Sequence, residues 1–169
     1  MSENIEEIHG ETCPVCFQKT LTLREQVMDI PYFGITHLFS MECSGCDYSM
    51  SDLEAEEGRK PIKQSFTIET EADLNARVVK SASATIKIPR IATIESGANS
   101  DGYVTNVQGV LERVKKVIEE LTEDDDKEIA KKAKNQLKKI QRVLWGREIV
   151  TITIQDPTGN SAIISDKTQ

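Results

Sequence analysis

Four cysteines, arranged as two Cys-x-x-Cys pairs, constrain this chain more than any other feature of its sequence. The pairs are Cys13-Pro14-Val15-Cys16 and Cys43-Ser44-Gly45-Cys46. A two-residue spacer lets one tight turn present two thiolates, and zinc binds four thiolates as a tetrahedron with Zn–S distances of about 2.3 Å. The sequence therefore predicts one structural zinc ion, with the ligands Cys13, Cys16, Cys43 and Cys46.

Two other uses of paired cysteines are less favoured. Disulfides persist in oxidising compartments, but residues 1–7 are acidic where a secretion signal is basic, so we expect a reducing cytoplasm. A thioredoxin-like redox site needs one pair in a βαβ context, whereas this chain has two pairs. Four thiolates also close the zinc coordination shell, which predicts a protein that is not an enzyme. We expect His9 in a tail and His37 in a strand, neither of them as a ligand.

Acidic side chains are concentrated in the part of the chain that holds the cysteines. Residues 1–60 contain twelve acids and four bases, whereas residues 61–169 contain sixteen acids and seventeen bases. Modules that read phosphates usually carry a basic surface, so this charge argues against a nucleic-acid partner. An acidic surface steers basic protein surfaces toward itself, which favours a protein partner. The longest run without a charged side chain, Ile30–Met41, is too short to span a bilayer, so we expect no membrane partner.

Residues 1–58 are predicted to form a zinc-ribbon finger with an acidic N-terminal tail. Alternating residues near Leu21–Val27 and the β-prone run Ile35–Met41 predict two strands, and Pro31–Gly34 suits the turn between them. Such a hairpin would bring the two cysteine pairs together. The charged stretch Ser51–Lys60 is interpreted as the boundary between this finger and the next unit.

Residues 59–169 are predicted to form a β-domain with an antiparallel helical hairpin at about 106–145. Apolar residues recur at helical spacing from Val107 to Leu121, and the polar stretch Thr122–Asp126 separates this helix from a second one. The apolar stripe predicted for the second helix is Ile129, Ala133, Leu137, Ile140 and Leu144. Short strands precede the helices, and a final hairpin around the turn Asp156–Gly159 is expected to follow them. The whole chain is therefore predicted as an α+β fold: a zinc-ribbon finger, then a β-sandwich or barrel-like domain into which the helices are inserted. The expected short strands are Ile62–Thr70, Val78–Ser81, Ala84–Ile88 and Ile91–Glu95.

Basic side chains follow one face of the second predicted helix. Such a face could bind RNA or an acidic protein, but a solvated face opposite an apolar stripe is the commoner explanation. The residues are Lys127, Lys131, Lys134, Lys138 and Arg142.

Several segments together resemble one known family. The block Asp73-Leu74-Asn75, Val78-Val79-Lys80-Ser81 and Ala84-Thr85-Ile86 through Ile88-Pro89, the small-residue stretch Gly102, Thr105 and Gly109-Val110-Leu111, and the segment Asp156–Ser161 join the four cysteines in this pattern. With them the chain resembles the ZPR-one zinc-finger proteins over nearly its whole length. Eukaryotic members carry the module of finger and β-domain twice, and the single copy here is similar to the archaeal form.

The resemblance implies a zinc-binding protein-interaction factor. Eukaryotic members bind translation elongation factor 1-alpha and act as a chaperone in its folding, so that factor is the expected partner. The alternative is an RNA-associated or ribosome-associated zinc ribbon that uses the basic helix face. For Asp73, Leu74 and Asn75, the sequence leaves open whether they form a corner of the β-domain or contact a partner.

Overall fold

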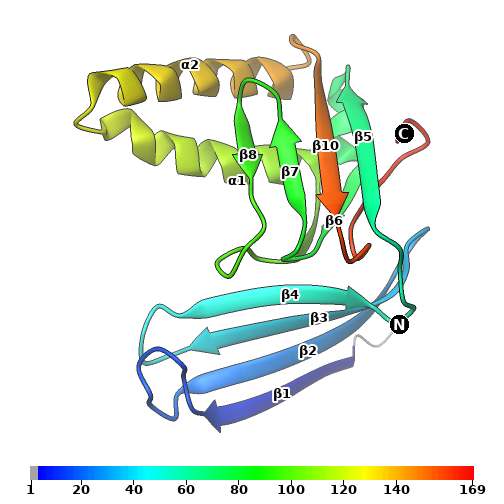
Figure 1. Ribbon diagram of the computed structural model, residues 1–169, viewed down its shortest axis with the longest axis vertical. Helices are drawn as coiled ribbons and strands as arrows, with labels where there is room; N and C mark the ends of the chain where they lie inside the picture. Colours follow the sequence, from blue (N-terminus) through cyan, green and yellow to red (C-terminus); the bar gives the residue numbers. More distant parts are fainter. Residues whose placement is uncertain (1–3) are drawn as a thin grey trace.

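The computed structural model describes residues 4–169, which form two stacked units (Figure 1). The first unit is an antiparallel sheet in the order β1-β2-β3-β4, and its β4 edge lies nearest the second unit. Two of its strands are the predicted hairpin, joined by the turn at Pro31–Phe33. The strands are β1 (Asn4–Glu11), β2 (Leu21–Ile30), β3 (Gly34–Cys43) and β4 (Ser49–Ala55).

The prediction of an acidic tail at the N-terminus was wrong. Residues 4–11 form β1, which pairs with β2 except at a bulge at Gly10, and His9 lies in this strand. The Glu7 carboxylate accepts a hydrogen bond of 2.7 Å from Arg24 on β2, so one of the acids that suggested a tail instead supports the pairing. Residues 1–3 of the predicted tail lie outside the described residues.

The second unit is a β-sandwich with a helical hairpin inserted between β9 and β10. This arrangement confirms the predicted α+β fold. One sheet has the order β5-β10-β7-β8 and the other β11-β6-β9. The strands are β5 (Ile62–Ile68), β6 (Arg77–Lys80), β7 (Thr85–Ile88), β8 (Ala92–Ile94), β9 (Tyr103–Asn106), β10 (Val150–Asp156) and β11 (Ala162–Ile164).

Strand β10 shows how the sequence builds the sandwich. Its alternate residues Ile152 and Ile154 are buried in the core, whereas Thr151 and Thr153 point to the other side of the sheet. There Thr151 meets Thr67 of β5 at 2.8 Å between the hydroxyl oxygens. Cross-strand pairs of this kind stabilise a sheet on the face that the core does not cover.

The helical insertion consists of α1 (Val107–Glu120), the short 3-10 helix η2 (Leu121–Glu123) and α2 (Lys127–Leu144), and the two long helices lie side by side (Figure 1). Each long helix starts with a side-chain cap: Asn106 accepts from the Gly109 amide and Asp126 from the Glu128 amide, both at 2.8 Å. Glycine at position 109 leaves room for the Thr105 hydroxyl, because a Cβ there would lie 2.0 Å from its oxygen. Neither helix in the described part of the chain is long and apolar enough to cross a bilayer.

The apolar stripe of α2 differs in part from its prediction. Ala133 and Ile140 are buried as expected, and so is Val143, which the predicted stripe did not include. Ile129 is exposed, because it lies in the first turn of α2, beyond the core, and Leu137 is only partly buried.

Replacing Leu137 by alanine is expected to lower the free energy of unfolding by about 1 to 2 kcal/mol. A fully buried leucine would cost about 2 to 5 kcal/mol, and the partial exposure of Leu137 reduces this loss. Replacing the exposed Lys134 in the same helix should cost under about 0.5 kcal/mol. Urea melts of the two variants measure both values, and equal losses would show that the two helix faces are wrongly assigned.

The prediction of a final hairpin was wrong, although the turn itself is present. The amide of Gly159 donates to the carbonyl of Asp156, but β10 and β11 then enter different sheets. The turn thus carries the chain from one layer of the sandwich to the other. Gly159 has a φ of +74°, and a Cβ there would lie 2.1 Å from the carbonyl oxygen of Lys60, so only glycine allows this contact with the segment between the units.

The two units share a small apolar core. Ile30, Phe33 and Leu53 of the zinc-ribbon sheet pack with Val79 of the sandwich. Polar contacts flank this core: the Asp52 carboxylate accepts from the Ala82 amide at 2.8 Å. Others join Ser51 to Asp101 and Gly102, and Ala55 to Asn160. The division between the units at residue 58 stays a prediction. Side chains of both units pack and form hydrogen bonds with the other unit.

Asp73 lies at a corner of the sandwich, in the 3-10 helix η1 (Glu71–Asn75). Its carboxylate accepts hydrogen bonds from the amides of Glu69 and Thr70 and from the ammonium of Lys167 near the C-terminus. Although burial raises the pKa of Asp73, these donors lower it to about 2. These contacts favour the corner role for Asp73 over the partner-contact role that the sequence left open.

Candidate metal centre

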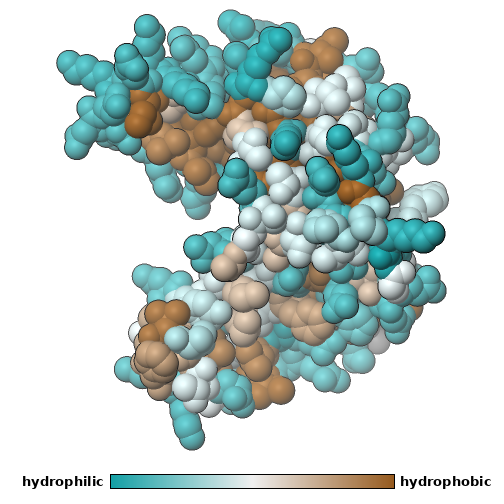
Figure 2. All heavy atoms as spheres, in the orientation of Figure 1, coloured by the Kyte–Doolittle hydropathy of each residue, from teal (hydrophilic) through white to brown (hydrophobic). Residues whose placement is uncertain are grey.

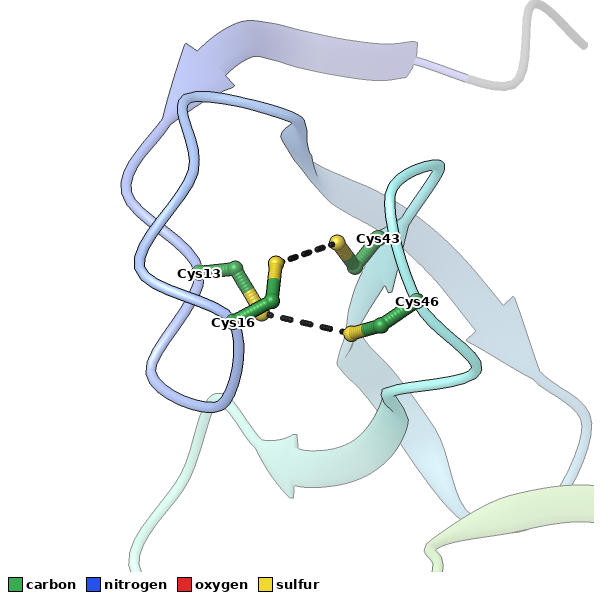
Figure 3. Close-up of side chains that lie close together, drawn as sticks. All are labelled: Cys13, Cys16, Cys43 and Cys46. Carbon is green, nitrogen blue, oxygen red and sulfur yellow. Dashed lines mark hydrogen bonds between the residues drawn. The ribbon is translucent and has the colours of Figure 1, made fainter.

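The zinc-ribbon hairpin places the two cysteine pairs at its open end (Figure 3). Cys13 and Cys16 lie on the turn that leads from β1 into β2, while Cys43 ends β3 and Cys46 lies on the turn before β4. Leu21, the first residue of β2, pairs directly with Cys43, so the register of the hairpin decides that the two turns meet.

The four sulfur atoms form a compact cluster of the size that one zinc ion requires. All four lie within 4.8 Å of one another. The Sγ atoms of Cys13 and Cys46 are 3.8 Å apart, and those of Cys16 and Cys43 are 3.7 Å apart (Figure 3). A tetrahedron with Zn–S distances of about 2.3 Å has sulfur–sulfur edges of about 3.8 Å. The cluster therefore fits one tetrahedral zinc ion.

Backbone amides and one hydroxyl surround the sulfurs. The amide of Val15 donates to Cys13 Sγ at 3.4 Å, and the amide of Gly45 donates to Cys43 Sγ at 3.3 Å. The Thr20 hydroxyl lies 3.1 Å from Cys43 Sγ. Donors of this kind stabilise thiolates and orient them toward a metal. Glycine at position 45 lets the Thr20 hydroxyl come close, because a Cβ there would lie 2.8 Å from the hydroxyl oxygen.

The thiols of Cys43 and Cys46 differ in acidity because they have different hydrogen-bond partners. The Thr20 hydroxyl, assisted by the Gly45 amide, lowers the pKa of Cys43 to about 6 against the opposing effect of burial. The pKa of Cys46 moves the other way: the Tyr48 amide lowers it, but burial and the neighbouring sulfurs raise it overall. Cys43 thus loses its proton readily, whereas deprotonation of Cys46 is unfavourable next to the other sulfurs. A divalent cation offsets the repulsion between thiolates and so favours loss of the remaining protons.

The remaining candidate residues lie away from the sulfurs. His9 contacts the Thr22 hydroxyl at 3.1 Å, and His37 on β3 contacts the Glu25 carboxylate at 2.7 Å. The basic residues predicted on one face of α2 are all exposed. Near them, a shallow groove of about 450 Å³ is lined by Arg90, Lys131, Lys132 and Lys139, among other residues.

Sequence reasoning missed the support that Thr20 gives to the metal centre. A threonine four residues after a cysteine carries no motif, and only the paired strands bring its hydroxyl onto Cys43. It also missed the exposed Phe17, whose φ of 60° places a bulky residue in the left-handed region at the tip of the first turn. Figure 2 shows hydrophobic atoms gathered at this end of the zinc-ribbon unit.

Comparison with known proteins matches both units. The model of the ZPR1 zinc-finger domain covers residues 4–59, and that of the ZPR1 jelly-roll domain covers residues 72–169. The jelly roll is the sandwich with its helical insertion. The zinc-finger match and the sulfur geometry agree on one structural zinc ion in this domain.

The chain is similar over most of its length to ZPR1-like proteins. It is 39% identical to an uncharacterized ZPR1-like protein of Methanocaldococcus jannaschii, over 96% of this chain and 83% of that protein. A ZPR1-like protein of Pyrococcus horikoshii is 37% identical, over 98% of this chain and 77% of that protein. A Schizosaccharomyces pombe protein named zinc finger chaperone zpr1 is 33% identical over 79% of this chain, which corresponds to 30% of that longer protein.

The Schizosaccharomyces pombe relative is named a zinc finger chaperone, and a Caenorhabditis elegans relative is named a zinc finger protein, which supports a zinc-binding protein-interaction factor. This chain contains both domains of the family, the zinc finger followed by the jelly roll. The two ZPR1-like relatives described above match it over most of their own length. The chain therefore belongs to the ZPR1 zinc-finger family, as a member with a single module of zinc finger and jelly roll.

Proposed function

We propose that this protein binds translation elongation factor 1-alpha, or assists its folding, through the zinc-ribbon unit, and that it performs no catalysis. The observation that carries the proposal is a closed four-sulfur centre in a part of the chain, residues 1–60, that has twelve acids against four bases. Such a centre organises a binding surface and leaves no position for a reacting group. The relative named as a chaperone and the resemblance to the eukaryotic family support the choice of partner.

The zinc ligands in this proposal are Cys13, Cys16, Cys43 and Cys46. A reducing cytoplasm would keep all four thiols free of disulfides and available to the metal. Four thiolates carry more negative charge than the two positive charges of the ion. The metal centre thus adds to the negative charge of residues 1–60, and the whole unit favours a basic surface on the elongation factor.

Reversing Glu54, Glu56 and Glu57 to lysine should slow association with the elongation factor and flatten its dependence on salt. All three side chains are exposed, so the change removes an attractive field and does not disturb packing. Dissociation should change less, because steering acts on the encounter of the two proteins. Stopped-flow kinetics across ionic strength measure both rates, and zinc content should stay at one ion per chain.

A matched control places the same charge change at the far end of the molecule. Glu119, Glu120 and Glu123 are also exposed, near the end of α1, and their reversal to lysine should leave association largely unchanged. Equal slowing by the two triple variants would show that net charge alone matters. A wild-type association rate that does not respond to salt would contradict electrostatic docking by the zinc-ribbon unit.

RNA binding at the basic groove beside α2 is the second candidate function. The groove holds four basic side chains, which could contact phosphates. None of its lining residues is aromatic, so it offers no platform for base stacking. In this alternative, binding of ribosomal or transfer RNA falls steeply with salt and is lost when Lys131 and Lys132 are changed to glutamate. RNA binding without such a loss would exclude the groove.

A further inference from the structure

The zinc-ribbon sheet has a face with an unusual order of side chains, which we call the open face. Strand register places Ile8 beside Leu23 and Leu23 beside Met41, so one row across the sheet is apolar. The next row, two residues along each strand, contains Glu6, Glu25 and Phe39. Both rows contribute to the lining of one shallow groove of about 330 Å³.

The open face is acidic without compensation from its own strands. Arg24 is the single lysine or arginine within β1–β4. It borders the groove, but the register of β2 directs its side chain to the opposite face. On that face the Arg24 guanidinium forms ion pairs with Glu7 at 2.7 Å and Glu42 at 3.2 Å. The basic neighbour of Glu25 on the open face is a histidine, His37, at 2.7 Å. A ligand for this face is therefore expected to bring positive charge.

The groove borders an open strand edge. β1 is the outermost strand, pairs with β2 on one side, and is exposed at all eight of its positions. Its other side carries backbone groups that are available for a further strand. A second copy of this chain is a poor partner for that edge, because Glu6 and Glu7 would meet the same acids in the second β1.

The acidic face and the open edge of β1 together indicate which kind of ligand would bind there. We propose that an extended, basic segment of the partner protein adds to β1 as a fifth strand. Side chains two positions apart in a strand point to the same face. The segment would therefore place a basic residue against Glu6 and an apolar residue two positions away against Ile8, where the apolar row begins. This inference rests on the proposed function, which is protein binding by the zinc-ribbon unit.

Two synthetic peptides of eight residues, the length of β1, test the pattern. In one, threonine occupies every second position, and lysine and valine alternate at the positions between. Lysine and valine therefore point to the same face of the strand. The other has the same composition, rearranged so that lysine and valine fall on opposite faces. The first peptide is expected to bind the zinc-loaded protein about five- to tenfold more tightly, from cross-strand pairs with Glu6 and Ile8. Equal affinity for the two peptides would overturn the proposal.

Hydrogen exchange tests whether the bound peptide is a strand. Amides of residues 4–11 should exchange more slowly when the first peptide is bound, because added-strand hydrogen bonds protect them. Binding without this protection would mean contact by side chains alone and would overturn the fifth strand.

Two isoleucines on β1 provide a matched pair of variants. Ile8 is 57% exposed on the open face and Ile5 is 51% exposed on the opposite face. Ile8→Asp should abolish the preference for the first peptide, whereas Ile5→Asp should retain it, although both add one negative charge to the same strand. Zinc content shows that each variant is folded. Equal behaviour of the two variants would overturn the assignment of the face.

Binding of the elongation factor by the same variants separates this inference from the proposed function. If Ile8→Asp binds the factor as tightly as the wild type does, the docking surface is overturned and the proposed function stands. If the wild type does not bind the factor but binds the first peptide selectively, the docking surface is supported and the choice of partner is overturned.

Discussion

Replacing Cys43 by serine is expected to reduce zinc content from one ion per chain to none and to unfold the end of the zinc ribbon that carries the cysteines. Cys43 is buried and packs with Cys13 and Leu21 in an apolar cluster that contains little besides the metal centre. Zinc binding contributes an apparent ~10 to 16 kcal/mol in small sites of this kind, which so small a cluster cannot replace. Elemental analysis measures the metal, and hydrogen exchange locates the unfolding.

The loss should stop short of the jelly roll. Its core is a separate cluster that includes Phe66, Leu111 and Ile140, so the amides of α1 and α2 should keep their protection in the Cys43→Ser variant. Val15→Ala is the control, because its side chain is exposed on the same turn and its amide, which donates to Cys13, is retained. Two metal ions per chain, or a disulfide in place of the metal, would contradict the four-cysteine site.

Replacing Asp156 by alanine is expected to lower the free energy of unfolding by about 3 to 5 kcal/mol. The carboxylate is fully buried and accepts hydrogen bonds from the hydroxyls of Ser81, Ser161 and Thr158 at 2.7, 2.5 and 2.7 Å. Its removal leaves two buried serine hydroxyls without their acceptor, and it removes a negative charge near the buried Lys80. Thermal or urea unfolding measures the loss.

The charge of Asp156 predicts a dependence on pH. Burial raises the pKa of Asp156, but the hydrogen bonds from Ser161, Thr158 and Ser81 outweigh it and lower the pKa below its ordinary value. The stabilisation is therefore present above about pH 4, where the unfolded chain is also ionised, and is lost as the pH falls through the lower folded pKa. The stability difference between the wild type and Asp156→Asn should shrink over that range.

Asp166→Ala is the control for this prediction, because Asp166 is exposed in the C-terminal segment and should cost under about 0.5 kcal/mol. Equal losses at positions 156 and 166 would show that the buried hydrogen bonds of Asp156 contribute nothing measurable.

The segment Asp156–Ser161 shows why some of the fold could not be predicted from the sequence. Proline and glycine at their positions do specify a turn, and the turn is present. The path of the chain after a turn depends on which strands are neighbours, and β11 pairs with β6 where a hairpin would pair it with β10. The same segment reaches the zinc ribbon through Asn160, a contact between residues 105 positions apart that no local pattern encodes.

The N-terminal strand was missed for a related reason. Its sequence, NIEEIHGE, has acids where a strand usually alternates apolar residues, and an exposed edge strand needs no such alternation. The partner strand supplies what the local sequence lacks, since β2 provides the backbone hydrogen bonds and Arg24 the charge for Glu7.

By itself, the sequence determined the features that depend on short-range chemistry. Two Cys-x-x-Cys pairs specify a zinc knuckle because two thiolates three positions apart fit one turn, and helical periodicity with caps at Asn106 and Asp126 specifies two helices. Only the tertiary structure decided which strands pair, that Lys80 and Asp156 are buried, and that Glu6 and Glu25 lie on one face beside an apolar row. These outcomes depend on contacts between residues far apart in the chain, whose free energies arise only when the whole fold brings them together.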